Sequence, residues 1–169
     1  MKNELPKYLE GLNLDDEKVQ IDIISKDSYD IKYIPNPSER VKMLAVLDDG
    51  YNLKFIENPS EKLQKIAMIT CGEAIGKIKD PSETVQALSV LDCAHNIGHI
   101  EHPTELVQVI AMMKCGFLLN RIKEPTELAK EVACANNALA LQYIDNPSER
   151  MIELACKESP NARKYLKNK

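Results

Sequence analysis

The sequence predicts an all-α fold, an α-solenoid in which short helix-turn-helix repeats stack into a right-handed superhelix. Three observations predict it. Prolines recur every 22 residues, each followed by Ser or Thr and then by Glu. Apolar residues recur within each repeat at helical spacing, and a glycine or alanine separates two such stretches in most repeats. Units that cannot bury their apolar faces alone do so by stacking.

The proline period defines six repeats, and a seventh in the same register precedes them without the proline. The prolines are Pro37, Pro59, Pro81, Pro103, Pro125 and Pro147. The seven repeats are 15–36, 37–58, 59–80, 81–102, 103–124, 125–146 and 147–168, and residues 1–14 form an N-terminal leader or cap. We expect one solenoid domain over 15–168. Asp22, Lys157 and Arg163 replace apolar residues in the terminal repeats, so we expect polar outer faces at both ends of a complete array.

Positions are numbered within a repeat from the proline as one. Position three is always Glu, position five is apolar throughout, position eight is apolar in six repeats, and position nine is small in six. This spacing predicts an α-helix of about eleven residues. We expect Asn36 to be its N-cap in the second repeat, Pro37 its first residue, and Glu39 the partner that reaches back to the cap.

The same N-cap is expected in other repeats at Asn58, Asp80 and Asn146. His102 and Glu124 are weaker caps, so those two helices should fray more. A second, shorter helix is predicted by apolar residues at positions seventeen and twenty, such as Leu53 and Ile56. Its expected caps are the position-thirteen residues Asp27, Asp49, Asn137 and Ser159.

A leucine-rich repeat is the alternative architecture with this period. It requires an L-x-x-L-x-L strand, and only Leu139-Ala140-Leu141 resembles that alternation. The Pro-Ser-Glu start opposes it, because it is typical of a helix N-terminus.

The repeat that runs from Asn36-Pro37-Ser38-Glu39 to Tyr51-Asn52-Leu53-Lys54-Phe55-Ile56 resembles a tandem-repeat family of unknown function. That family occurs in bacteria, phages and large viruses. The resemblance covers 15–168 and implies the repeat architecture. The family's phage and effector members imply a protein that interferes with a host component. Repeat 125–146 departs from the pattern at 135–137, where Ala-Asn-Asn replaces the expected apolar residue and glycine turn, so we expect less regularity there.

Composition narrows the function classes. The 169 residues are 44% hydrophobic and 28% charged, with a formal net charge of −4, which is too small to indicate a nucleic-acid binder. No apolar run approaches the ~20 residues of a membrane helix. Five cysteines without compact spacing favour a reducing, cytoplasmic setting. Phosphate loop, nucleophile elbow, HExxH and paired CxxC motifs are all absent, so we expect no enzyme activity and no cofactor.

Three sets of side chains could take part in catalysis or bind a metal ion. The glutamates at position three are explained by helix capping. The position-thirteen cysteines are Cys71, Cys93 and Cys115, each expected at a helix N-terminus, which lowers a thiol's pKa; the alternative is a small residue at a half-buried turn. His95 and His99 are four residues apart and follow Cys93, so these three are the candidate metal ligands, against an interpretation as surface residues.

Columns fifteen and nineteen carry the candidate interface, because they vary in kind while the core columns do not. They hold both phenylalanines and five of the six tyrosines. Aromatic residues and Arg are enriched at interface centres. The candidate partner-binding residues are Tyr51, Phe55, Lys77, His95, His99, Phe117, Arg121 and Tyr143. The alternative is that the aromatics only cover the joints between repeats.

Gly76 and Gly98 stand in column eighteen, directly before Lys77 and His99. Because glycine has no side chain, we expect a shallow groove beside each of these two residues. We expect a protein partner and no membrane, with the chain a monomer or homodimer. Single-stranded nucleic acid is the alternative partner, because the aromatics alternate with Lys54, Lys77, His99 and Arg121.

Overall fold

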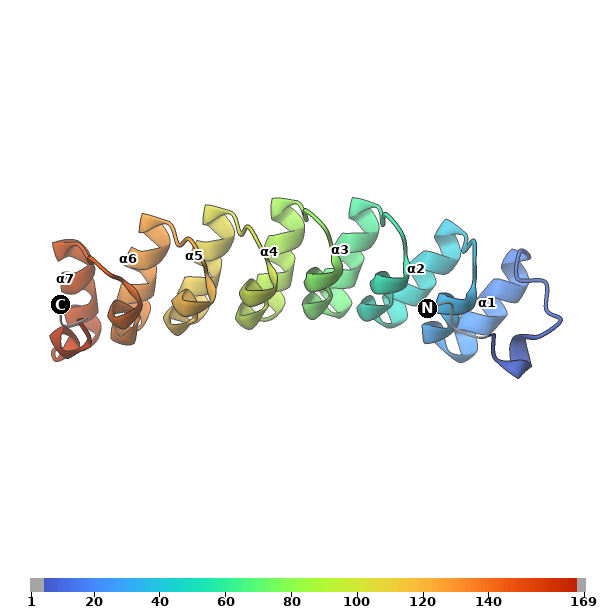
Figure 1. Ribbon diagram of the computed structural model, residues 1–169, viewed down its shortest axis with the longest axis horizontal. Helices are drawn as coiled ribbons and strands as arrows, with labels where there is room; N and C mark the ends of the chain where they lie inside the picture. Colours follow the sequence, from blue (N-terminus) through green and yellow to red (C-terminus); the bar gives the residue numbers. More distant parts are fainter. Residues whose placement is uncertain (1–4, 167–169) are drawn as a thin grey trace. The chain divides into compact units, whose positions relative to one another are not determined.

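Each repeat folds as one α-helix followed by one short 3-10 helix. The computed structural model describes residues 5–166, so residues 1–4 of the predicted leader and 167–168 of the last repeat lie outside the described residues (Figure 1). The α-helices are α1 (Glu17–Lys26), α2 (Glu39–Asp48), α3 (Glu61–Thr70), α4 (Glu83–Asp92), α5 (Glu105–Lys114), α6 (Glu127–Asn136) and α7 (Glu149–Glu158). The 3-10 helices are η1 (Lys7–Leu9), η2 (Ser28–Tyr33), η3 (Gly50–Phe55), η4 (Gly72–Lys77), η5 (Ala94–His99), η6 (Gly116–Arg121), η7 (Ala138–Tyr143) and η8 (Ala162–Tyr165).

The all-α repeat fold is therefore confirmed. Residues 5–166 contain no strand, so the leucine-rich alternative is wrong. The chain divides into two compact units, Met1–Lys79 and Asp80–Lys169, next to the boundary between the third and fourth repeats. Within each unit neighbouring α-helices pack side by side and the 3-10 helices follow one edge (Figure 1), which is the arrangement of an α-solenoid. A single domain over 15–168 remains a prediction.

The α-helices begin two residues later than predicted. The N-cap of α2 is Ser38, whose Oγ accepts a hydrogen bond from the Val41 N–H at 3.3 Å. Glu39 is then the first helical residue and cannot complete the predicted capping box; its carboxylate instead lies in the first turn, where the helix dipole favours negative charge. The prediction that Asn36 caps this helix is wrong, because the proline precedes the cap instead of following it.

The same correction applies along the chain. Ser60, Ser82 and Ser148 cap α3, α4 and α7 in place of the predicted Asn58, Asp80 and Asn146. The N-caps of α5 and α6 are Thr104 and Thr126, so the reason given for fraying at His102 and Glu124 is wrong. Thr126 Oγ1 accepts from the Ala129 N–H at 3.3 Å, whereas Thr104 makes no side-chain cap bond. Asn58 and Asp80 have φ of 47° and 50°, and this left-handed backbone explains the residue type there.

The second helix of each repeat is a 3-10 helix, six residues long in η2 to η7. Its predicted caps are confirmed at three positions: the side chains of Asp27, Asp49 and Asn137 each accept from the backbone N–H two residues on, at 2.8 to 3.0 Å. Ser159 is not such a cap, because η8 begins only at Ala162 and its N-cap is Asn161. Six residues make two turns of a 3-10 helix, and such helices are rarely longer.

The core is built from six positions of the repeat. Positions five, nine and ten of the α-helix are buried in most repeats, as at Val41, Ala45 and Val46. Positions sixteen, seventeen and twenty of the 3-10 segment cover them, as at Leu53 and Ile56. Position eight is not core as its apolar residues suggested: it lies on the helix flank and is half-exposed or exposed in every repeat.

A glutamine at position six joins neighbouring repeats. Gln108 is 4% exposed; its Nε2 donates to the Pro103 carbonyl at 3.0 Å, and its Oε1 accepts from the Thr126 N–H of the next repeat at 2.9 Å. Gln86 makes the same pair of bonds to Pro81 and Thr104. In the first unit, Gln20 Oε1 accepts from the Ser38 N–H at 3.2 Å. Each side-chain amide thus donates to a backbone carbonyl just before its own helix and accepts from the backbone N–H of the N-cap residue of the next helix.

The glycines at position fourteen allow a close approach between repeats. A Cβ on Gly50 would lie 2.4 Å from the Ala67 carbonyl oxygen, and one on Gly116 would lie 2.5 Å from that of Ala133. Neither glycine has a positive φ, so the predicted role as a turn residue is replaced by a packing role. The N–H of Gly116 also donates to Asn136 Oδ1 at 2.8 Å.

The expected irregularity in repeat 125–146 is not observed. Its helix α6 has ten residues, like every other α-helix of the described chain. Asn136 has a definite role there, because its Nδ2 donates to the Met113 carbonyl at the end of α5 at 3.0 Å. The polar residue satisfies backbone groups that an apolar residue would leave without a protein partner.

The leader is tied to the first repeat. Leu9 is buried, and the Tyr8 hydroxyl donates to Asp30 Oδ2 at 2.6 Å. This hydrogen bond to a carboxylate, together with its negative charge, raises the pKa of Tyr8 to about 12. The phenol therefore keeps its proton, and with it the bond, throughout the neutral range.

Replacing Gly50 by Ala should lower the free energy of unfolding by about 1–3 kcal/mol, because the new methyl group meets the rigid Ala67 carbonyl. Gly98→Ala is the matched control, since its nearest neighbour would be the Arg121 side chain at 3.8 Å. The control should be neutral or slightly stabilising. Urea titration followed by circular dichroism measures both, and equal stability of the two variants would contradict the packing role.

Removing the bridging amide in Gln108→Ala should destabilise the fold by about 2 kcal/mol, because the Thr126 N–H and the Pro103 carbonyl lose their protein partner. Gln64→Ala is the comparison: Gln64 is half-buried, and its Nε2 donates to the Pro59 carbonyl of its own repeat at 2.9 Å. The same urea titration should show a smaller loss for Gln64→Ala, and the reverse order would exclude the bridge as the main link.

Candidate functional site

The candidate residues of columns fifteen and nineteen lie on the 3-10 helices. Residues four apart, such as those of columns fifteen and nineteen, share one face of an α-helix. A 3-10 helix has three residues per turn, so residues four apart point about a third of a turn away from each other. The contacts instead run between repeats. Tyr29 of η2 packs edge-to-face on Phe55 of η3, with ring centres 5.0 Å apart, and Phe117 of η6 packs on Tyr143 of η7 at 5.6 Å.

In the first unit these rings combine with lysines into one surface, here called the aromatic–lysine cluster. Its members are Tyr29, Lys32, Tyr33, Tyr51, Lys54, Phe55 and Lys77. Lys54 Nζ lies 4.2 Å from the ring centre of Tyr51, 4.7 Å from that of Phe55 and 5.0 Å from that of Tyr29. All of these distances are within the range of cation–π attraction.

The sequence interpretation missed Lys32 as a member of this surface and left Tyr29 outside the candidate set. Lys32 Nζ lies 3.7 Å from the Tyr29 ring centre and 4.6 Å from that of Tyr33. The signal was present: Tyr29 and Lys32 are three residues apart, which brings side chains together on a 3-10 helix.

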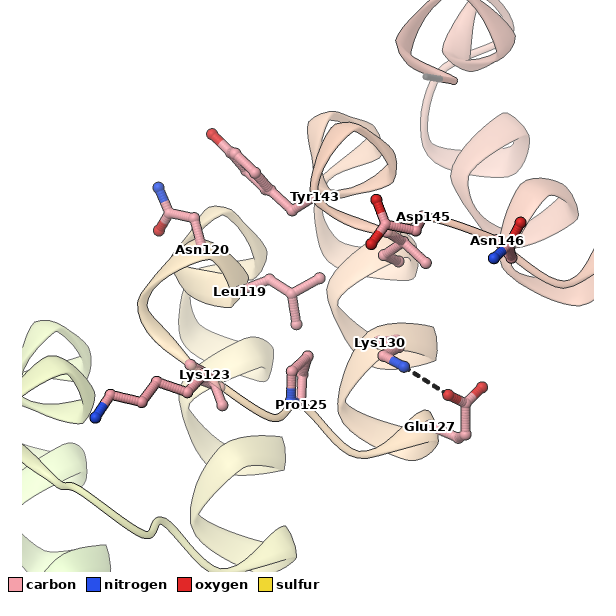
Figure 2. A pocket seen from close by; sticks show the side chains of 11 residues that line it. Leu119, Asn120, Lys123, Pro125, Glu127, Lys130, Tyr143, Asp145 and Asn146 are labelled. Atoms are coloured by element: carbon pink, nitrogen blue, oxygen red, sulfur yellow. Dashed lines mark hydrogen bonds and ion pairs between the residues drawn. The ribbon is translucent and has the colours of Figure 1, made fainter. Parts of the chain in front are cut away.

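In the second unit the predicted residue Tyr143 borders an open pocket of about 600 Å³ between the fifth and sixth repeats. Figure 2 shows Tyr143 and Asn120 at one end, Glu127 and Lys130 at the other, and Leu119 between them. Lys130 Nζ pairs with Glu127 Oε1 at 2.6 Å. The pocket is lined by apolar, polar and charged residues. Because Lys130 and Glu127 already pair with each other, their charges are less available to a ligand.

A smaller pocket of about 270 Å³ lies between the fourth and fifth repeats. Gly98, His99 and Arg121 line it, so the predicted groove beside Gly98 is confirmed and two candidate residues meet there. Both side chains are exposed. The groove predicted beside Gly76 and Lys77 remains a prediction.

Of the three candidate metal ligands, only Cys93 and His95 lie close to each other. Cys93 Sγ lies 3.9 Å from His95 Nδ1, and both residues are exposed. His99 is four residues further along η5, on another side of this 3-10 helix. Within residues 5–166, no group of three or more His, Cys, Asp or Glu is arranged to hold a metal ion.

The position-thirteen cysteines are N-cap residues of η4, η5 and η6, as predicted, but their thiols make no cap hydrogen bond. Cys134 lies in the core, and burial raises the pKa of its thiol to about 11. All five cysteines are free.

In both units exposed apolar residues, which the sequence interpretation did not single out, stand at position eleven of the α-helices. They are Leu47 (51% exposed), Ile69 (71%), Leu91 (51%) and Met113 (66%). The column reads as an ordinary apolar position, so only measured exposure distinguishes it from core. We call it the apolar column.

The glutamates of position three are exposed, and none contributes to a paired-carboxylate site in the described chain. Glu39 and Glu127 pair with lysines of their own helices at 2.7 and 2.6 Å. Glu17 Oε1 accepts from the Ser38 hydroxyl of the next repeat at 2.6 Å. These three glutamates therefore form bonds within the first turn of their helices or with the next repeat.

Comparison with protein-family models, with curated proteins and with solved structures finds no match to this chain. The resemblance to the phage and bacterial repeat family therefore rests on the repeat motif alone. None of the helices in residues 5–166 is long and apolar enough to span a membrane.

The two cysteine environments predict different alkylation rates. At pH 8, iodoacetamide should modify exposed Cys93 first, whereas Cys134 should react at least a hundredfold more slowly, because only the thiolate attacks and its pKa is about 11. Peptide mass spectrometry over a time course measures both rates. In denaturant the two should react alike, and equal rates in the folded protein would contradict the burial of Cys134.

Proposed function

We propose that this chain is a non-enzymatic repeat protein that binds another protein through the exposed side of its 3-10 helices. It would act as an inhibitor, adaptor or effector, as a monomer or homodimer, in the reducing cytoplasm that five free cysteines favour. The proposed contact residues are Tyr51, Phe55 and Lys77 in the first unit and His95, His99, Phe117, Arg121 and Tyr143 in the second.

The observation that carries this proposal is the pairing of aromatic rings across repeats. Tyr29 with Phe55 and Phe117 with Tyr143 are held edge-to-face, while Tyr29 and Phe117 stay exposed. Rings fixed by their neighbours lose little freedom when a partner binds, and they offer a large contact area. The interpretation that they only cover joints explains the pairing but leaves their exposure unexplained.

The apolar column is the rival surface. It is uniformly aliphatic, whereas the 3-10 side combines Tyr, Phe, His, Lys and Arg in a different order in each repeat. Tyrosine and arginine are enriched among residues that dominate binding energy, and leucine is under-represented. The mixed surface also supplies the polar contacts that make binding selective. We therefore assign the interface to the 3-10 helices.

The function is tested by affinity capture with the full chain as bait, with and without nuclease, followed by mass spectrometry. We expect a protein partner that survives nuclease. The variant carrying Phe55→Ala, His99→Ala, Arg121→Ala and Tyr143→Ala should lose it, at least tenfold by titration, with helicity nearly unchanged.

The matched control carries Leu47→Ala, Ile69→Ala and Met113→Ala in the apolar column, and it should retain the partner. Loss of the partner in this control alone would move the interface to the α-helices. Recovery of nucleic acid alone would replace the proposal with the single-stranded nucleic-acid alternative. A collapse of helicity in the aromatic variant would show that its columns are core.

A further inference from the structure

The aromatic–lysine cluster brings several ammonium groups close together without neutralising them. Lys32 and Lys54 both lie within 5.0 Å of the Tyr29 ring centre, so the two nitrogens are at most about 9 Å apart. Lys54 and Lys77 share the Tyr51 ring in the same way, at 4.2 and 5.9 Å. These are like charges in neighbouring repeats of one compact unit, and they repel one another.

No carboxylate within the described chain forms an ion pair with these three lysines. This contrasts with Lys26, Lys42 and Lys65 of the α-helices, each of which pairs with an acidic residue of its own helix at 2.7 to 3.0 Å. Three aspartates of the same unit accept other hydrogen bonds: Asp27 and Asp49 cap the 3-10 helices, and Asp30 accepts from Tyr8. The cluster therefore presents unpaired positive charge on a chain whose net charge is negative.

We propose that this cluster binds an extended acidic protein segment in the polyproline II conformation, with a carboxylate at every third residue. The inference rests on the proposed protein-binding function and names the partner's chemistry. Polyproline II rises 3.1 Å per residue with three residues per turn, so every third side chain lies on one face, about 9 Å apart. Neighbouring helices also pack about 9 Å apart. Successive carboxylates would thus meet Lys32 and Lys54, which occupy the same column of adjacent repeats.

The rings complete the site. Aromatic-lined surfaces bind polyproline II segments, because the extended chain is already ordered before it binds and loses little conformational entropy. The lysines are held by the rings before a partner arrives: Lys32 contacts two rings and Lys54 three. Charges that are placed in advance lose less freedom on binding.

Single-stranded nucleic acid fits the same surface less well. Base recognition requires an open aromatic face for stacking. Each of the four rings already has an ammonium group within 5.0 Å of its centre, and Tyr29 and Phe55 also occupy each other. A base would have to displace these contacts, whereas a carboxylate can bind the outward side of each ammonium group without displacing it.

The test is fluorescence anisotropy with the full chain and a labelled peptide of four Glu-Pro-Pro triplets. The control peptide has the same composition, with its four glutamates in a row before eight prolines. We expect the triplet peptide to bind at least tenfold more tightly, and its affinity to fall as salt is added. Equal affinity of the two peptides overturns the proposed spacing and with it the proposal.

The matched variants change the three lysines together. Lys32→Gln, Lys54→Gln and Lys77→Gln should weaken triplet-peptide binding about tenfold or more, while the corresponding Arg substitutions, which keep the charge, should preserve it. Helicity should be unchanged in both, because none of the three side chains is part of the buried core. An oligothymidylate that binds when the peptide does not would overturn the proposal in favour of nucleic acid. Capture of the cellular partner by the Gln variant as efficiently as by the native chain would also overturn it, while leaving the proposed function intact.

Discussion

The stacking of repeats at three joints depends on a buried amide at position six. Helices leave their first N–H groups and the carbonyls before them without intrahelical partners, and burying such groups is costly. Gln20, Gln86 and Gln108 satisfy a cap N–H of the following repeat with the acceptor end of the amide, and a backbone carbonyl with the donor end. Because both ends are used, the bond fixes the offset between two helices as well as their contact. Lys42 and Lys130 occupy this position in other repeats and pair with glutamates instead.

The sequence predicted what local chemistry decides. The proline period gave the repeat boundaries, and Asp27, Asp49 and Asn137 revealed the start of the second helix because an Asx side chain caps the residues next to it. The prediction was wrong where contacts with a neighbouring repeat determine the local structure. The cap moved from Asn36 to Ser38, whose N–H is bonded to Gln20, 18 residues away. Position fourteen is small because the next helix approaches it, as Ala67 approaches Gly50, and no local pattern shows that.

The candidate site was predicted in its residues but not in its geometry. Columns fifteen and nineteen do hold the exposed rings of Tyr29 and Phe117, yet Tyr29 meets Phe55 across a joint and not a neighbour on its own helix. The change from an α-helix to a 3-10 helix accounts for this, and it also separates His99 from His95 and Cys93. Lys32 was overlooked although it follows Tyr29 by three residues and precedes Tyr33, because the prediction considered only columns fifteen and nineteen and Lys32 stands in column eighteen. Residue type therefore selected the candidate columns, while helix type decided which of their side chains are in contact.

The hydrogen bonds between repeats have a consequence for how the protein is made. They join residues only 16 to 24 positions apart, as between Gln20 and Asn36 or Ser28 and Asn52. Chains rich in such short-range contacts fold quickly, because little loop entropy is lost before a contact forms. A repeat leaving the ribosome therefore needs only its predecessor to become ordered, so folding can keep pace with translation. The same property allows a repeat to be gained or lost in evolution with only its two joints rebuilt, which would lengthen or shorten the proposed binding surface in steps of 22 residues.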